Sequence, residues 1–171
     1  MFRGRGDEIR VYPLSFSEYV SVYQGSQDEA WDDYLVYGGL PLILTMEEAE
    51  DKAEYLNSLF QKVYISDIVE RHNVRNKAEL DELVDVLASA IGSYTNQSKL
   101  VRTFKSVKNK SISDKTIKNY TDYLIDSYLI SKADRYDIKG KKHIGKLAKY
   151  YFEDVGLRNA RLGFRQIEET H

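Results

Sequence analysis

The chain has 171 residues, of which 42% are hydrophobic and 30% are charged, a composition typical of a soluble globular protein. It holds no apolar run long enough for a membrane span, no cysteine for a disulfide or thiolate metal site, and three widely separated histidines. The net charge of −2 is uneven, because residues 96–150 carry 14 Lys and Arg against 5 Asp, a net +9. These features predict a cytoplasmic protein without a metal site, whose basic segment attracts an anionic partner.

The first third of the chain predicts two short helices. Ser15 or Ser17 can cap a helix that ends near residue 23. A second, acid-capped helix in residues 26–37 is expected to end at the two glycines that precede Pro41. The expected apolar face of this second helix consists of Trp31, Tyr34 and Leu35.

Two longer helices are predicted next, in residues 47–72 and 77–91. The connection between them is short, which suggests that they pack against each other. The apolar stripe of the first one consists of Ala49, Ala53, Leu56, Phe60, Val63 and Tyr64.

Asp67 and Arg71 lie four residues apart on the first of these helices and can form an ion pair. On a solvated surface such a pair contributes only about 0.3–0.5 kcal/mol. A second interpretation starts from the apolar stripe, which Asp67 continues beyond Phe60. On that interpretation the carboxylate is buried or lies at an interface, and Arg71 supplies the partner that it needs.

The basic segment has the pattern of a helix, a loop, a second helix and two strands. The predicted helices span residues 96–107 and 113–130, and the predicted strands span 129–138 and 147–154. This order is that of a winged helix-turn-helix. We therefore predict a mainly α protein, with a helical bundle followed by a winged helix-turn-helix that has a small antiparallel β-hairpin. The expected divisions are a helical connector in 1–92, a winged-helix domain in 93–154 and a short helix in 155–171.

Two sets of side chains in this half of the chain have competing interpretations. Glu153 and Asp154 are neighbouring carboxylates that could hold a metal, but consecutive strand residues point to opposite faces, which favours Asp154 as the cap of the last helix.

Tyr120, Tyr123 and Tyr128 lie on a basic helix, where tyrosines can stack on nucleic-acid bases. Helical spacing instead places Tyr120 and Tyr128 in the core.

The winged helix-turn-helix pattern predicts which residues contact nucleic acid. In this motif the second helix of the pair enters the major groove of duplex DNA, and we expect the wing to lie against the phosphate backbone. The candidates are Lys115, Lys118 and Asn119 on the exposed face of that helix, and Lys139, Lys141, Lys142 and Lys146 on the wing.

Residues 140–146 also read G-x-x-x-x-G-K, which is most of a nucleotide-binding P-loop. A P-loop needs a helix that starts at its lysine and a Ser or Thr after that lysine to hold magnesium. Here Leu147 follows the lysine, and the next residues predict a strand. The segment is therefore interpreted as the tip of the hairpin.

Five segments, in order, resemble one family: prokaryotic AAA-type ATPases that carry a P-loop domain, then a helical and winged-helix region, then a nuclease-like domain. The segments are GRGDEIRVYPLSFSEY, YLVYGGLP, SDIVERH, SDKTIKNYTDYLIDSYLI and KYYFEDVGLRNARLGF. The resemblance implies that this chain corresponds to the middle of such a protein, and that ATP and magnesium bind elsewhere in the parent. It also implies that Arg5 and Arg71 lie near the nucleotide, Arg71 on that of a neighbouring subunit in a homo-oligomer.

Two functions from different classes remain open on the sequence. In the first, the chain is a non-catalytic segment of an ATPase and its basic winged helix binds duplex DNA. In the second, the same module docks on an acidic protein surface, either its own, that of another subunit or that of the missing ATPase and C-terminal domains. No complete active site is recognised, so an enzyme in its own right has little support.

Overall fold

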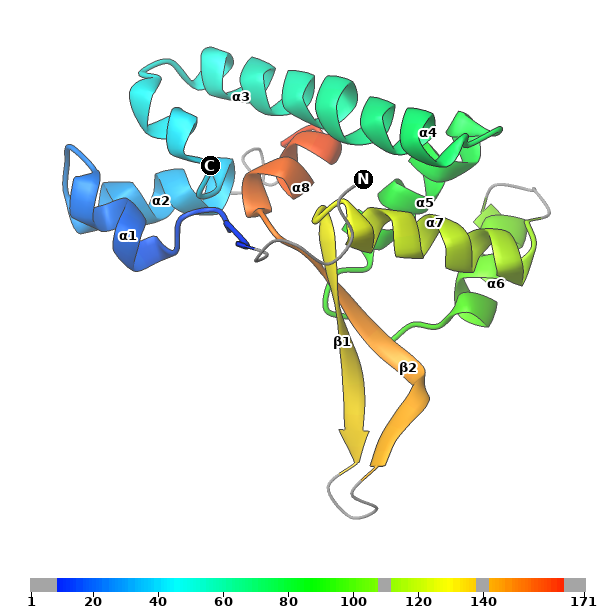
Figure 1. Cartoon of the computed structure of the whole chain (residues 1–171). Coiled ribbons are helices and arrows are strands. Elements are labelled where there is room, and N and C mark those ends of the chain that lie inside the picture. Colours follow the sequence, from blue (N-terminus) through cyan, green and yellow to red (C-terminus); the bar gives the residue numbers. More distant parts are fainter. Residues whose placement is uncertain (1–8, 108–111, 138–141, 165–171) are drawn as a thin grey trace.

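The computed structural model describes residues 9–107, 112–137 and 142–164, which form helices and one small antiparallel sheet (Figure 1). The first helices are α1 (Phe16–Val22), α2 (Gln27–Tyr37), η1 (Pro41–Thr45), α3 (Ala49–Ser58), η2 (Leu59–Ile65) and α4 (Ser66–His72). After them come α5 (Lys77–Ser89), α6 (Gln97–Val107), α7 (Asp114–Asp126), β1 (Ile130–Asp137), β2 (Lys142–Phe152) and α8 (Val155–Arg161). The predicted fold class, mainly α with a small β-hairpin, is confirmed.

Capping side chains set the starts of the first two helices. Ser15, rather than Ser17, caps α1, and Ser26 caps α2; each forms a capping box with a glutamate three residues later. The expected apolar face of α2 is confirmed in part: the rings of Trp31 and Tyr34 pack against Phe16 of α1, but Trp31 is still 46% exposed and Leu35 is 45% exposed. The buried residue of α2 is Ala30, and the Leu35 and Val36 carbonyls near its end accept hydrogen bonds from the Asn159 amide.

A π-helical turn changes the phase of the long helix, which runs through α3, η2 and α4 as one rod (Figure 1). The buried positions are Leu56 and Phe60, four residues apart, and then Ile65, five residues further on. An extra residue in the turn rotates the following side chains by about 100°. Asp67 therefore leaves the apolar stripe, and the interpretation that placed its carboxylate in a buried position is wrong. Its side chain is 45% exposed and pairs with Arg71 at 2.6 Å, the predicted surface ion pair.

The second half of the chain has the connectivity of a winged helix. The helices α5, α6 and α7 are followed by the antiparallel pair β1–β2, and Thr95, before α6, forms a bridge to Ala148 of β2. The helix α7 is shorter than predicted, because Tyr128 adopts a left-handed φ of 57° and β1 begins two residues later. Tyr120 is buried as expected, but Tyr128 is half-exposed and lies outside the core.

A tight junction joins α2 to α8, more than a hundred residues later. Asp154 caps α8 by accepting a hydrogen bond from the Leu157 amide at 2.9 Å, which confirms its predicted role. Its other carboxylate oxygen accepts one from the Gly39 amide at 2.8 Å. Burial raises the pKa of Asp154, against the lowering effect of these backbone donors. The amide of Asn159 donates to the Leu35 and Val36 carbonyls at the end of α2.

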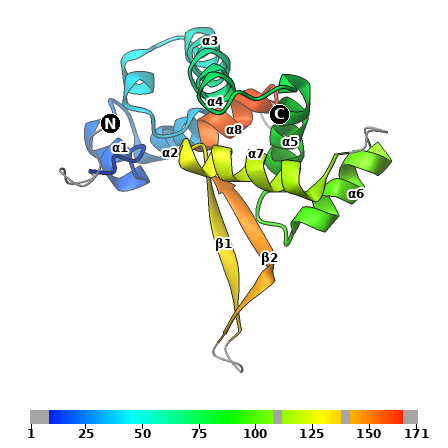
Figure 2. The ribbon, with the colours of Figure 1, turned by 45° about the vertical axis from the view of Figure 1, so that its right-hand side comes forward.

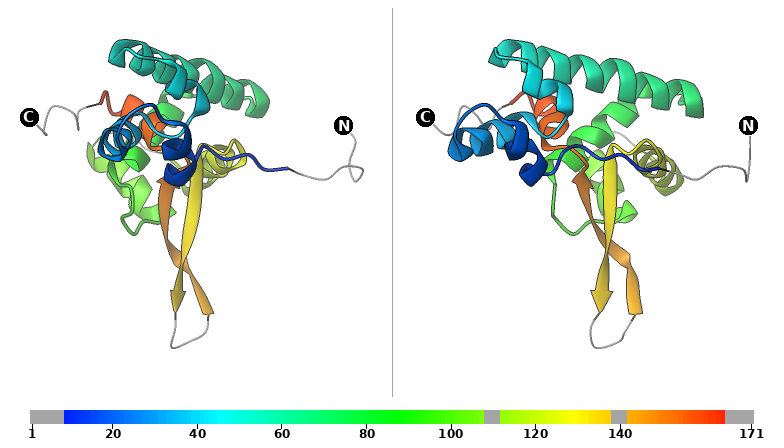
Figure 3. Two further views of the ribbon diagram at one scale, coloured as in Figure 1. Left: turned by 90° about the vertical axis from the view of Figure 1, so that its left-hand side faces the viewer. Right: turned by 60° about the vertical axis from the view of Figure 1, so that its left-hand side comes forward.

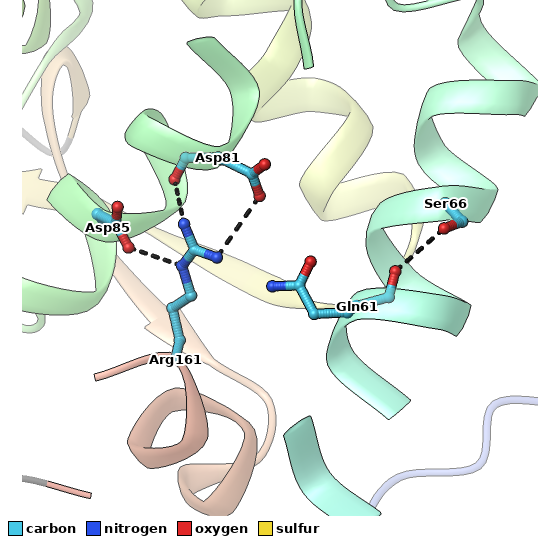
Figure 4. Close-up of polar contacts among 5 residues, drawn as sticks. All are labelled: Gln61, Ser66, Asp81, Asp85 and Arg161. Carbon is cyan, nitrogen blue, oxygen red and sulfur yellow. Dashed lines mark hydrogen bonds and ion pairs between the residues drawn. The ribbon is translucent and has the colours of Figure 1, made fainter. Parts of the chain in front are cut away.

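Arg161 links α8 to α5, the helix that precedes the predicted winged-helix domain (Figure 4). Its Nε donates to the Asp85 carboxylate at 2.6 Å, and its Nη2 donates to the Asp81 carbonyl at 3.0 Å. The guanidinium lies 5.6 Å from the centre of the Phe60 ring in the π-helical turn. In that turn the Ser66 hydroxyl donates to the Gln61 carbonyl at 3.1 Å (Figure 4). These contacts tie α8 to the helices that precede residue 92. One hydrophobic core contains residues from both sides of residue 92, and the expected division there remains a prediction.

A buried ion pair fixes α1, α2 and α3 together. Lys52 is 8% exposed, and its ammonium donates to both oxygens of Asp33 at 2.7 and 2.8 Å. The Tyr19 hydroxyl donates to the same carboxylate. Burial, and then the hydrogen bond to Asp33, raise the pKa of Tyr19. Every group in this set has a partner, so we assign it a structural role.

Candidate nucleic-acid interface

The orientation of α7 is set by its buried face. Ser113 caps the helix, its hydroxyl accepting from the Thr116 amide at 3.0 Å. Four residues on one side enter the core: Ile117, Tyr120, Thr121 and Leu124. Lys115 and Lys118 are therefore exposed and Asn119 is half-exposed, as a contact surface requires.

The exposed face of α7 is nevertheless not basic. Lys118 pairs with Asp122 at 2.7 Å, one turn later on the same face. Asp114 and Asp126 are also exposed, so three carboxylates accompany Lys115 and Lys118. With three carboxylates against two lysines, the exposed face of α7 lacks the net positive charge expected of a helix that contacts phosphates.

The positive charge is concentrated on α6 instead. Residues 93–113 contain four Lys, one Arg (Arg102) and no Asp or Glu. Lys99, Arg102 and Lys105 succeed one another along the exposed side of the helix. The opposite side is fixed in the core by Leu100 and Phe104. The structure thus presents three cations on one rigid surface without a neighbouring acidic residue in the same helix.

A second basic group lies beside α6, on the outer face of the β-sheet. We call Tyr94, Lys99, Arg135 and Lys149 the Tyr94 cluster. The Lys149 ammonium is 5.0 Å from the centre of the Tyr94 ring, and the Arg135 guanidinium carbon is 5.8 Å from it. The ammonium of Lys99, from α6, donates to the Tyr94 carbonyl at 2.9 Å. None of these four residues was among the candidates from sequence.

The hairpin projects from the helical body in every view, as a wing does (Figures 1 and 3). Lys142 begins β2 and Lys146 lies within it. The chain after Lys146 is a strand, so it lacks the helix that a P-loop needs. The candidates Lys139, Lys141 and Arg5 lie outside the described residues.

The end of α4 lies against α7. The ring of His72 stacks on that of Tyr123, with centres 3.8 Å apart and planes 9° apart. Arg71, the preceding residue, keeps its guanidinium on the Asp67 carboxylate at the surface. Its expected proximity to a nucleotide remains a prediction.

Over the described ranges, the structure contains no cluster of three or more metal-binding side chains. No helix in the described part of the chain has the length and apolar character needed to cross a membrane.

The fold and the basic surface define a winged-helix module, and comparisons with known proteins place it in a family. The model of a family described as a domain of unknown function, DUF8612, matches residues 28–168, and the chain belongs to this family. An uncharacterised protein of Haemophilus influenzae is 34% identical over 168 residues, which cover 95% of this chain and 42% of the relative. An uncharacterised protein of Methanocaldococcus jannaschii is 27% identical over 174 residues, which cover 95% of this chain and 38% of that relative. The chain thus spans about two fifths of the length of these curated relatives.

Proposed function

We propose that this chain is a DNA-binding winged-helix segment of a longer protein, and that α6 and the outer face of the sheet make the main contacts. The observation that carries the proposal is the exposed row Lys99, Arg102 and Lys105 on a helix without acidic residues. Arg135 and Lys149 extend this row onto the hairpin. Figure 2 shows α6 at the edge of the helical body, on the side of the hairpin.

The chemistry of this surface favours binding to the phosphate backbone over reading of bases. Lysine and arginine neutralise phosphates and release counterions, which supplies affinity without sequence preference. Among the described candidates, Asn119 of α7 is the polar residue that could contact the edge of a base, since a side-chain amide can form hydrogen bonds with adenine. Its neighbour Lys118 is engaged by Asp122. We therefore expect affinity to come from α6 and the sheet, and selectivity for sequence to be low.

Salt dependence tests the proposal. If Lys99, Arg102, Lys105, Arg135 and Lys149 each neutralise one phosphate, log K should fall with log salt with a slope of about −4.5. The measurement is fluorescence anisotropy of a labelled duplex over a series of salt concentrations. Polyglutamate of equal charge is the control competitor. Absence of binding at about 50 mM salt, or equal displacement by polyglutamate, would contradict DNA binding.

The alternative function is docking on an acidic protein surface, and it is supported by the excess of acidic residues outside the basic segment. Residues outside 96–150 carry 11 Lys and Arg and 22 Asp and Glu, a net −11. A basic module can bind such a surface on a second copy or on another domain. A salt-sensitive dimer seen by light scattering, together with no DNA binding, would favour this alternative.

We further propose that the parent protein is an AAA-type ATPase, on the strength of the resemblance described above. The matched segment covers less than half of each relative, which leaves length in them for a nucleotide-binding domain. ATP and magnesium would bind in that domain. We expect the full-length Haemophilus relative to hydrolyse ATP with magnesium, as measured by phosphate release. No hydrolysis, with or without DNA, would contradict this part of the proposal and leave the DNA-binding part standing.

A further inference from the structure

Tyr94 is an exposed aromatic residue held on a rigid backbone. The next residue, Thr95, exchanges two hydrogen bonds of 2.9 Å with Ala148, so the backbone beside Tyr94 is fixed against β2. Thr95 is buried, whereas the Tyr94 side chain points to the other face of the sheet and is 47% exposed. A large aromatic residue presented in this way loses little conformational freedom when it binds a ligand.

The neighbours of Tyr94 add positive charge to this aromatic surface. Arg135 comes from β1 and Lys149 from β2, and both place their charges within 6 Å of the ring centre. Asp134, the acidic residue directly before Arg135 in the described part of the sheet, forms its ion pair with Lys132 at 2.7 Å. Arg135 and Lys149 have no such ion pair among the described residues. The site thus offers an aromatic ring with two cations over it, and a base that stacks on the ring would move these cations aside toward its own phosphate.

This combination matches one nucleotide whose base is unpaired. A nucleotide joins a flat base, which can stack on tyrosine, to a phosphate, which arginine and lysine bind. A base inside a duplex is covered on both faces by its neighbours, so its faces are not accessible to a side chain. An unpaired base at a duplex end or in a single-stranded tail has a free face.

We propose that the Tyr94 cluster binds an unpaired nucleotide of DNA, with its base on the Tyr94 ring and its phosphate between Arg135 and Lys149. The proposal rests on DNA binding by α6, because Lys99 belongs to both surfaces and joins them. A groove of about 380 Å³ between α5 and α6 opens beside Lys99, with Asp85, Val86 and Leu100 in its wall. A duplex on α6 can therefore extend a single-stranded tail across Tyr94.

The test compares a blunt duplex with the same duplex carrying a short single-stranded tail that contains 2-aminopurine. For the wild-type chain, we expect the tail to tighten binding by about 5- to 100-fold and to quench the 2-aminopurine, as stacking on one aromatic side chain does. Tyr94→Leu should abolish both effects, so that the tailed and the blunt duplex bind with equal affinity. Tyr94→Phe should retain them, because the ring remains.

Tyr151→Leu is the matched control. Tyr151 is an exposed tyrosine on the same sheet, in register with Ser131. The Tyr151→Leu variant should still bind the tailed duplex more tightly than the blunt one. A Tyr94→Leu chain that still binds the tailed duplex more tightly and still quenches the probe would overturn the inference. If the wild-type chain did not bind the blunt duplex at all, the proposed function itself would be overturned, so the two failures are distinguishable.

Discussion

Replacement of Gly156 by alanine is expected to destabilise the whole fold by about 3 kcal/mol or more. A Cβ on Gly156 would lie 2.0 Å from the Tyr37 carbonyl oxygen, at the end of α2. That oxygen belongs to the backbone and cannot move aside as the end of a side chain can. The clash would also separate Asp154 from the Gly39 amide, which would leave a buried donor and acceptor unpaired.

The measurement is the midpoint of thermal unfolding, which should fall by about 6–12 °C for a chain of this size. Gly25→Ala is the control, since its Cβ would meet only the Tyr23 ring and the Glu29 carboxylate, which are side-chain groups. That variant should lose less than about 1 kcal/mol. An unchanged midpoint for Gly156→Ala would show that the α2–α8 junction does not hold the fold together.

The local features of this fold could be predicted from sequence because they depend on neighbouring residues. Ser113 and Asp154 were identified as caps, since a cap and the amide that it binds are three residues apart. The order of helices and strands likewise predicted the winged helix. The phase of the long helix was not predictable, because the π-helical turn inserts its extra residue where the spacing of Leu56 and Phe60 is still regular.

The candidate site was only partly predictable, because some of its contacts join residues that are distant in sequence. The helical period placed Lys115 and Lys118 on the exposed face of α7, but the effect of Asp122 was overlooked. The Tyr94 cluster depends on the bridge between Thr95 and Ala148, which are distant in sequence. One signal was available in the sequence: the stretch 93–113, which has no acidic residue, predicts the basic surface of α6.

A reversal of charge on α6 is expected to weaken DNA binding far more than the same reversal on α7. Arg102 and Lys105 have no acidic neighbour on their helix, so their full charge is available to phosphates. Lys118 on α7 is already paired with Asp122, and Lys115 follows Asp114. The double variants Arg102→Glu/Lys105→Glu and Lys115→Glu/Lys118→Glu change the net charge equally, so long-range repulsion is matched.

The central claim, that α6 carries the DNA-binding surface, is tested most directly by the dissociation constants of these two variants for one duplex at about 100 mM salt. Circular dichroism confirms beforehand that both are folded. We predict that the α6 variant loses at least about a hundredfold in affinity and the α7 variant less than about tenfold. Equal losses, or a greater loss for the α7 variant, would contradict the account and return the interface to α7.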